Sequence, residues 1–136
     1  MNQIKFYLFV FLISFGVAGE IQYQPILLSG LITNPKQEIS GMDLYNDQIM
    51  LLPENLGGFL YMISKGEILN ALEKKDRIPI EPKQPAFHTP DYSKSIRGFE
   101  GLEAIAFNGN NVYITLESKD DETMRGYLAW GTIDPT

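Results

Sequence analysis

The feature that most constrains this chain is a repeat within its 136 residues. Residues 39–55, ISGMDLYNDQIMLLPEN, align without gaps on residues 102–118, LEAIAFNGNNVYITLES, at an offset of 63. In both copies apolar runs flank a short turn, Asn46-Asp47 in the first and Gly109-Asn110 in the second, and these residue types suit positive φ. Each copy therefore predicts a β-hairpin. Two small units that cannot each bury both faces alone indicate a stacked repeat fold.

A third strand is expected after each hairpin, at residues 59–63 and 127–133, so that each unit is an antiparallel meander. Between the units, residues 64–77 change to helical spacing, with a capping box at Ser64 and Glu67. The predicted class is all-β: a partial β-propeller of about two antiparallel blades plus a leading strand at residues 21–32, with one short helix between the blades. A two-sheet sandwich built from the same strands is the structural alternative.

The N-terminus has the pattern of an export signal. Lys5 precedes an apolar run over residues 6–17, and Val17-Ala18-Gly19 supplies the small residues that a signal peptidase needs. The run is shorter than the ~20 residues of a membrane-spanning helix, which favours a cleaved signal over a permanent anchor. We therefore predict a signal peptide at 1–19, a secreted or periplasmic protein, and no membrane contact beyond that peptide.

Propellers close with about four to eight blades, more than the two predicted units supply. Residues 20–136 are accordingly expected to be the N-terminal part of a larger propeller domain, with the remaining blades missing. The aromatic residues Tyr61, Tyr127 and Trp130 are interpreted as residues that pack between blades.

Composition excludes several classes of function. The net charge of -6 and the lack of a basic patch argue against a nucleic-acid partner. The chain has no cysteine, which removes disulfides, thiolate metal sites and cysteine nucleophiles. Its single histidine, His88, lies in a proline-rich loop, and no serine stands in a nucleophile motif, so no catalytic residue can be named.

Acidic residues recur at the strand ends of the repeat. Glu54 and Glu117 occupy equivalent positions, and counting along the second hairpin puts Glu100 on the same face as Glu117, whereas Glu103 is expected to point to the other face. We predict that carboxylates of successive blades meet at one mouth of the propeller channel. Ser40, Asn55 and Ser118 are the neutral oxygen donors expected beside them.

Oxygen ligands of this kind suit a hard cation such as Ca²⁺, and the predicted metal ligands are Glu54, Glu100 and Glu117. Solvated glutamates at strand ends are the simpler alternative. The run Asp120-Asp121-Glu122 is interpreted as a solvated hairpin tip.

The chain resembles the phytase-like, or esterase-like phytase, domain family of secreted bacterial β-propellers. The motifs that carry the resemblance are RGFEGL at 97–102, NGNNVY at 108–113 and EISGM at 38–42. The resemblance implies a propeller, export and metal-dependent phosphoester or ester hydrolysis, with Glu100 as the motif residue carried over and Arg97 as a substrate-binding candidate. The sequence departs from the family pattern at Glu103, which is inserted before Ala104-Ile105.

Two functions are compatible with these observations. The first is a calcium-dependent hydrolase of the phytase-like kind. The second is a non-catalytic propeller that binds a small molecule or a partner protein at its channel mouth.

Overall fold

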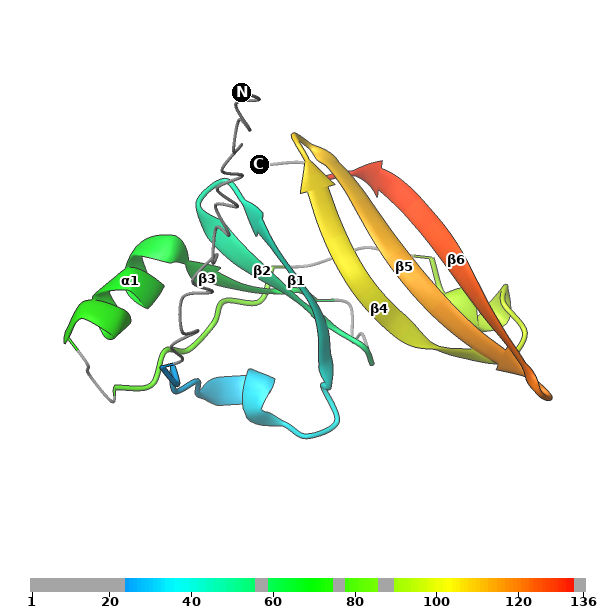
Figure 1. Cartoon of the computed structure of the whole chain (residues 1–136), viewed down its shortest axis with the longest axis horizontal. Helices are drawn as coiled ribbons and strands as arrows, with labels where there is room; N and C mark the ends of the chain where they lie inside the picture. The colour runs from blue at the N-terminus through cyan, green and yellow to red at the C-terminus, as the bar shows by residue number, and fades with distance from the viewer. Residues whose placement is uncertain (1–23, 56–58, 75–77, 86–89, 134–136) are drawn as a thin grey trace, which may run out of the picture.

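The computed structural model describes residues 24–55, 59–74, 78–85 and 90–133. These residues form two three-stranded antiparallel sheets, which lie at an angle to one another with β1 beside β4 (Figure 1). The elements in chain order are η1 (Gly30–Thr33), β1 (Ile39–Tyr45), β2 (Gln48–Pro53), β3 (Tyr61–Ser64), α1 (Lys65–Lys74), η2 (Tyr92–Lys94), β4 (Phe99–Asn108), β5 (Asn111–Asp120) and β6 (Thr123–Thr132). The predicted all-β class with two meanders and one short helix is confirmed, and the described residues form no closed ring of blades.

The two hairpins have the same register at the predicted offset. Leu44 pairs with Ile49 in the first sheet, and Phe107 pairs with Val112 in the second. In the turns, Asn46 and Asp47 both adopt positive φ, whereas in the second copy Gly109 does so and Asn110 does not. The structure therefore confirms the repeat that the sequence alignment indicated.

The first sheet is covered on both faces. One face places Met50, Leu52 and Leu60 against the second sheet, in a cluster that includes Leu102, Ile105, Val112, Ile114 and Leu116. The other face places Leu51, Tyr61 and Ile63 against Ile32, with Leu28, Ile49, Ile68 and Ile80 packed around them. This alternation follows from the period of two along β2, where successive side chains point to opposite faces.

Polar contacts also join the two sheets along β1 and β4. The Asp43 carboxylate accepts a hydrogen bond from the Phe107 backbone N–H at 2.6 Å, and the Ser40 hydroxyl donates to the Leu102 carbonyl. Gly41 lies against the β4 backbone so closely that a Cβ there would be 2.9 Å from the Ile105 nitrogen. The sheets are therefore held at a short distance and in one relative position.

Three expectations about the elements need correction or adjustment. The leading strand predicted at 21–32 is wrong for its described part: Leu28 makes a single bridge to Ile80, and residues 30–33 form the 3-10 helix η1. Pro25 and the positive φ of Gly30 explain this, since neither suits a continuous strand. The first three residues of that range lie outside the described residues.

The helix is confirmed over Lys65–Lys74; of the predicted range 64–77, Ser64 is the last residue of β3, and residues 75–77 lie outside the described residues. Its capping box forms as expected: the Glu67 N–H donates to the Ser64 hydroxyl at 3.1 Å, and the Ser64 N–H donates to the Glu67 carboxylate at 3.2 Å. Tyr61 is buried as an interior aromatic, whereas Trp130 is 75% exposed and packs between no sheets in the described part of the chain.

Candidate functional site

Glutamates of both sheets meet where β2 ends beside β4 and β5. Glu54 directly follows β2, and its side chain crosses to Gly101 of β4, where a Cβ would lie 2.5 Å from the Glu54 Cγ. Gly101 is paired with Glu117 of β5. The absence of a side chain at Gly101 therefore allows Glu54 of the first sheet to approach the carboxylates of the second.

Glu103 belongs to this group, contrary to the expectation that it points to the other face. The register of β4 against β5 shifts between Leu102 and Ala104, so Glu103 is the extra residue of a β-bulge. A second shift between Phe99 and Gly101 places Glu100 in the same kind of irregularity, and Gly101 lies opposite Glu117. Counting alternate residues predicts the face of a side chain only in a regular strand. At a bulge the extra residue shifts the alternation, so its side chain can point to the face that the count excludes.

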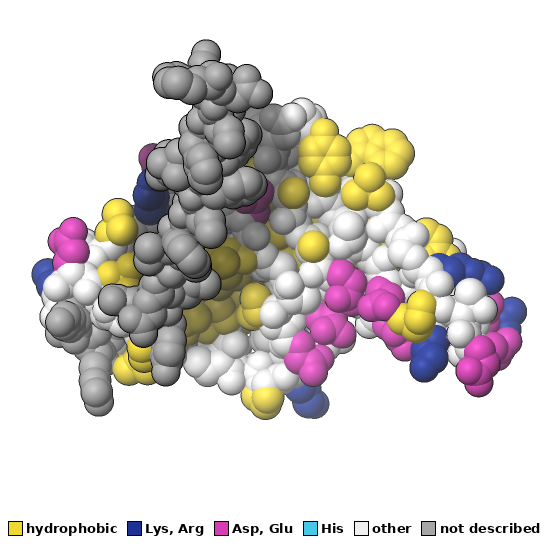
Figure 2. All heavy atoms as spheres, viewed as in Figure 1, with side chains coloured by type: hydrophobic (Ala, Val, Ile, Leu, Met, Phe, Trp, Pro, Cys, Tyr) yellow, Lys and Arg dark blue, Asp and Glu magenta, His cyan; other side chains and the backbone are white. Residues whose placement is uncertain are grey.

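The electrostatics of Glu103 show how close the carboxylates are. Its pKa is raised above the ordinary glutamate value, first by burial, and then by the charges of Glu117 and Glu54, a side-chain hydrogen bond with Glu117 and the charge of Glu100. Two carboxyl groups form a hydrogen bond only when one of them carries a proton. We name the four residues Glu54, Glu100, Glu103 and Glu117 the glutamate cluster; Figure 2 shows acidic side chains gathered in this part of the molecule.

The neutral donors predicted beside the glutamates are differently placed. Ser40 contacts the Leu102 carbonyl of β4, and the Asn55 amide donates to the Glu38 carboxylate at 2.7 Å. Ser118 is fully buried on the opposite, core-facing side of β5, so its hydroxyl lies away from the glutamate cluster. The expectation for Ser118 is therefore wrong, because Glu117 and Ser118 are consecutive in a strand and point to opposite faces.

The glutamate cluster has donors suited to a hard cation, but it is not a preformed coordination site. Carboxylate oxygens are the ligands that Ca²⁺ prefers, and the pKa of Glu103 is raised first by burial and then by neighbouring negative charges, which a cation would offset. Within the residues described, no group of three or more His, Cys, Asp or Glu side chains is arranged to hold a metal ion. The metal-binding role of Glu54, Glu100 and Glu117 thus stays a prediction.

Arg97, the predicted substrate-binding residue, lies beyond the cluster towards the β5–β6 turn. Its Nε is 3.2 Å from one oxygen of Asp120, and the Arg125 Nη1 is 3.8 Å from the other. Asp120 is therefore an ion-pair partner and not part of a solvated tip, which is limited to Asp121 and Glu122. Both arginines interact with a carboxylate of this chain, and the side chain of Arg97 remains 80% exposed.

Comparison with protein-family models, with curated protein sequences and with solved structures found no match to this chain. Among the described residues, none of the helices is long and apolar enough to cross a membrane. The predicted signal peptide at 1–19 lies outside the described residues.

Proposed function

We propose that this chain supplies two adjacent blades of an exported, phytase-like β-propeller and binds a hard divalent cation such as Ca²⁺ at the glutamate cluster. The observation that carries the proposal is the approach of the Glu54 side chain of one sheet to Gly101 of the next, beside Glu103, whose pKa is raised first by burial and then by the charges of Glu117 and Glu54. Carboxylates that approach one another at this end of the two sheets repel one another, and a bound cation would attract all of them.

The fold supports this proposal through the repeat. Two meanders of equal register stack face to face with their first strands, β1 and β4, side by side, as consecutive blades of a propeller do. Glu54 and Glu117 then occupy equivalent positions of the repeat in successive blades, Glu54 directly after β2 and Glu117 within β5.

The proposed activity is cation-dependent hydrolysis of phosphoesters or esters. In it the glutamate cluster would hold the cation, which would supply Lewis-acid polarisation of the substrate oxygen, and Arg97 would contact the anionic group. Arg97 would have to exchange Asp120 for the substrate, which its exposed side chain allows.

A non-catalytic propeller that binds a ligand at this end is the second candidate. The engagement of both Arg97 and Arg125 by Asp120 favours it, because a phosphate-binding site usually presents cationic groups that are free to contact the substrate.

Calcium binding is tested by calorimetric titration and thermal unfolding of the protein after treatment with EDTA. Saturating Ca²⁺, at 100 times its dissociation constant, is expected to stabilise the protein by about 2.7 kcal/mol. Glu54→Gln and Glu117→Gln should weaken this response, whereas the control Glu73→Gln, an equal change of charge on the exposed face of α1, should preserve it. An absence of heat and of any melting shift, or the same response in all three variants, would contradict the cation site.

Hydrolysis is tested with p-nitrophenyl phosphate and p-nitrophenyl acetate, with and without Ca²⁺. Turnover that requires Ca²⁺ and falls in Glu100→Gln and Arg97→Ala supports the hydrolase. Calcium binding without turnover of either substrate would reject the hydrolase and leave the ligand-binding propeller.

A further inference from the structure

Within the described part of the chain, no element covers one face of the second sheet, although the counterpart of this face in the first sheet is covered. Residues directly opposite one another in an antiparallel pair share a face, and the pairs Ala104–Thr115, Ala106–Tyr113, Thr115–Leu128 and Tyr113–Trp130 therefore define a single face. We name the central, mostly apolar part of this side the open face; its members are Ala104, Ala106, Tyr113, Thr115, Leu128 and Trp130, and Glu117 follows them on the same side of β5.

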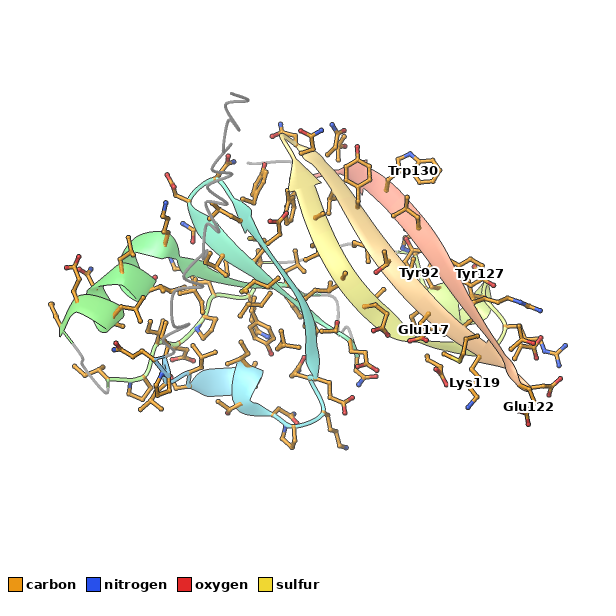
Figure 3. All side chains as sticks on the ribbon, in the orientation of Figure 1. Tyr92, Glu117, Lys119, Glu122, Tyr127 and Trp130 are labelled. Atoms are coloured by element: carbon orange, nitrogen blue, oxygen red, sulfur yellow. The ribbon has the colours of Figure 1, made fainter. Side chains whose placement is uncertain are left out.

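The open face is apolar and accessible to solvent. Trp130 is 75% exposed and Leu128 is 56% exposed, whereas Tyr113 is partly buried. Figure 3 shows the Trp130 side chain projecting away from β6, and Figure 2 shows apolar side chains at the same end of the second sheet. A sheet face of this composition is usually covered by another layer.

The repeat identifies what that layer should be. The offset of 63 gives the first-sheet counterparts of four open-face residues: Gly41 for Ala104, Asp43 for Ala106, Met50 for Tyr113 and Leu52 for Thr115. For the third strand, Gly126-Tyr127-Leu128 aligns with Gly58-Phe59-Leu60. This alignment makes Leu60 the counterpart of Leu128 and Met62 the counterpart of Trp130. All six counterparts face the second sheet. Gly41 and Asp43 contact the β4 backbone, and the other four belong to the hydrophobic cluster between the sheets or pack against it.

We propose that the open face is the docking surface for a third three-stranded sheet of the same repeat, carried by the same polypeptide. The existing interface between the two sheets supplies the argument, because the third sheet would continue it in the same direction. The occupant should present a face of branched aliphatic side chains, like the one that β4 and β5 present to the first sheet.

The existing interface also predicts details of this occupant. Glu54 packs over Gly101 of the next sheet, and its counterpart Glu117 should pack over a residue without a side chain in the third sheet. The open face has Ala106 at the position equivalent to Asp43, so it lacks the carboxylate that accepts a backbone N–H hydrogen bond in the first interface. Apolar contact should therefore account for more of the second interface than of the first.

This inference rests on the propeller part of the proposed function and not on cation binding, so failure of the calcium experiment leaves it intact. The test uses the natural gene product, expressed from its whole reading frame. Because residues 1–136 contain no cysteine, the single variants Leu128→Cys and Thr115→Cys place a reporter on the open face, and Leu69→Cys places one on α1, where the leucine is 48% exposed.

Maleimide labelling, read at each site by peptide mass spectrometry, measures whether the face is covered. We expect the Leu128→Cys and Thr115→Cys thiols to react at least about tenfold more slowly than the Leu69→Cys thiol, at all protein concentrations. The comparison uses only variants whose melting temperature equals that of the parent. Equal rates at the three sites would overturn the proposal. Protection that disappears on dilution would also overturn it, because the occupant would then be a second copy of the chain.

Discussion

Gly41→Ala tests whether the two sheets are held by the close approach of β1 and β4. The added Cβ would lie 2.9 Å from the Ile105 nitrogen and 3.0 Å from the Ala104 Cα. Both neighbours are backbone atoms, so no side chain can rotate away and the sheets must separate locally. Overpacking of this kind costs about 1–3 kcal/mol. At about 4 °C per kcal/mol for a domain of this size, the melting temperature should fall by roughly 4–12 °C.

The matched control is Gly126→Ala in β6, where a Cβ would meet nothing within 4 Å and the backbone φ is not in the left-handed region. This variant should melt within a few degrees of the parent, since a surface substitution changes stability by about 0.5 kcal/mol or less. Differential scanning calorimetry and urea unfolding measure both variants. Equal stability of Gly41→Ala and Gly126→Ala would refute the claim that the sheets contact through the backbone at Gly41.

Three further predictions concern the interface and the glutamate cluster. Asp43→Ala, which leaves the Phe107 N–H without its acceptor, should cost about 1–3 kcal/mol in urea unfolding, and Asp43→Asn should restore most of it; equal losses would contradict the hydrogen bond. The raised pKa of Glu103 favours its protonated form in the folded state, so the loss of folding stability caused by ionised Glu103 should grow as pH rises above about 4.5. With EDTA present, Glu103→Gln should therefore have the same melting temperature as the parent at pH 4 and a higher one at pH 7. Melting temperatures of the two proteins that change in parallel with pH would argue against the glutamate cluster. Leu60→Ala should lower the free energy of unfolding by about 2–5 kcal/mol, because Leu60 is 1% exposed. Leu128→Ala, measured on residues 20–136 alone, should lower it little. Similar losses at these equivalent positions would contradict the claim that the open face is uncovered.

The repeat made much of the fold predictable from sequence. Turn residues and period-two alternation identified both hairpins and their register beside the turns, because the pairs Leu44–Ile49 and Phe107–Val112 are fixed by short-range chain geometry. The capping box identified the start of α1 for the same reason. These features depend on residues that are close in sequence.

The candidate site was less predictable because it depends on local irregularity and on the contact between sheets. Glu54 and Glu117 were found through the repeat, but the bulge that adds Glu103 inserts one residue without a distinctive sequence signal. In the sequence the bulge is marked by Glu103 itself, the residue at which the chain departs from the phytase-like pattern that it resembles. The approach of Glu54 to Gly101 requires knowledge of how the sheets stack, and no pattern within one strand contains it.

The shared register of the two hairpins has a consequence for assembly. Modules whose hairpins share the same turn length and the same register beside the turn are liable to exchange places during folding, within one molecule or between two. Gly41 and Asp43 make the first sheet different from the second, in which alanines occupy both positions, so only the first sheet offers β4 a gap for its backbone and an acceptor for the Phe107 N–H. This asymmetry gives the stack a direction, because only the order in which the first sheet faces β4 provides both the gap at Gly41 and the Asp43 acceptor.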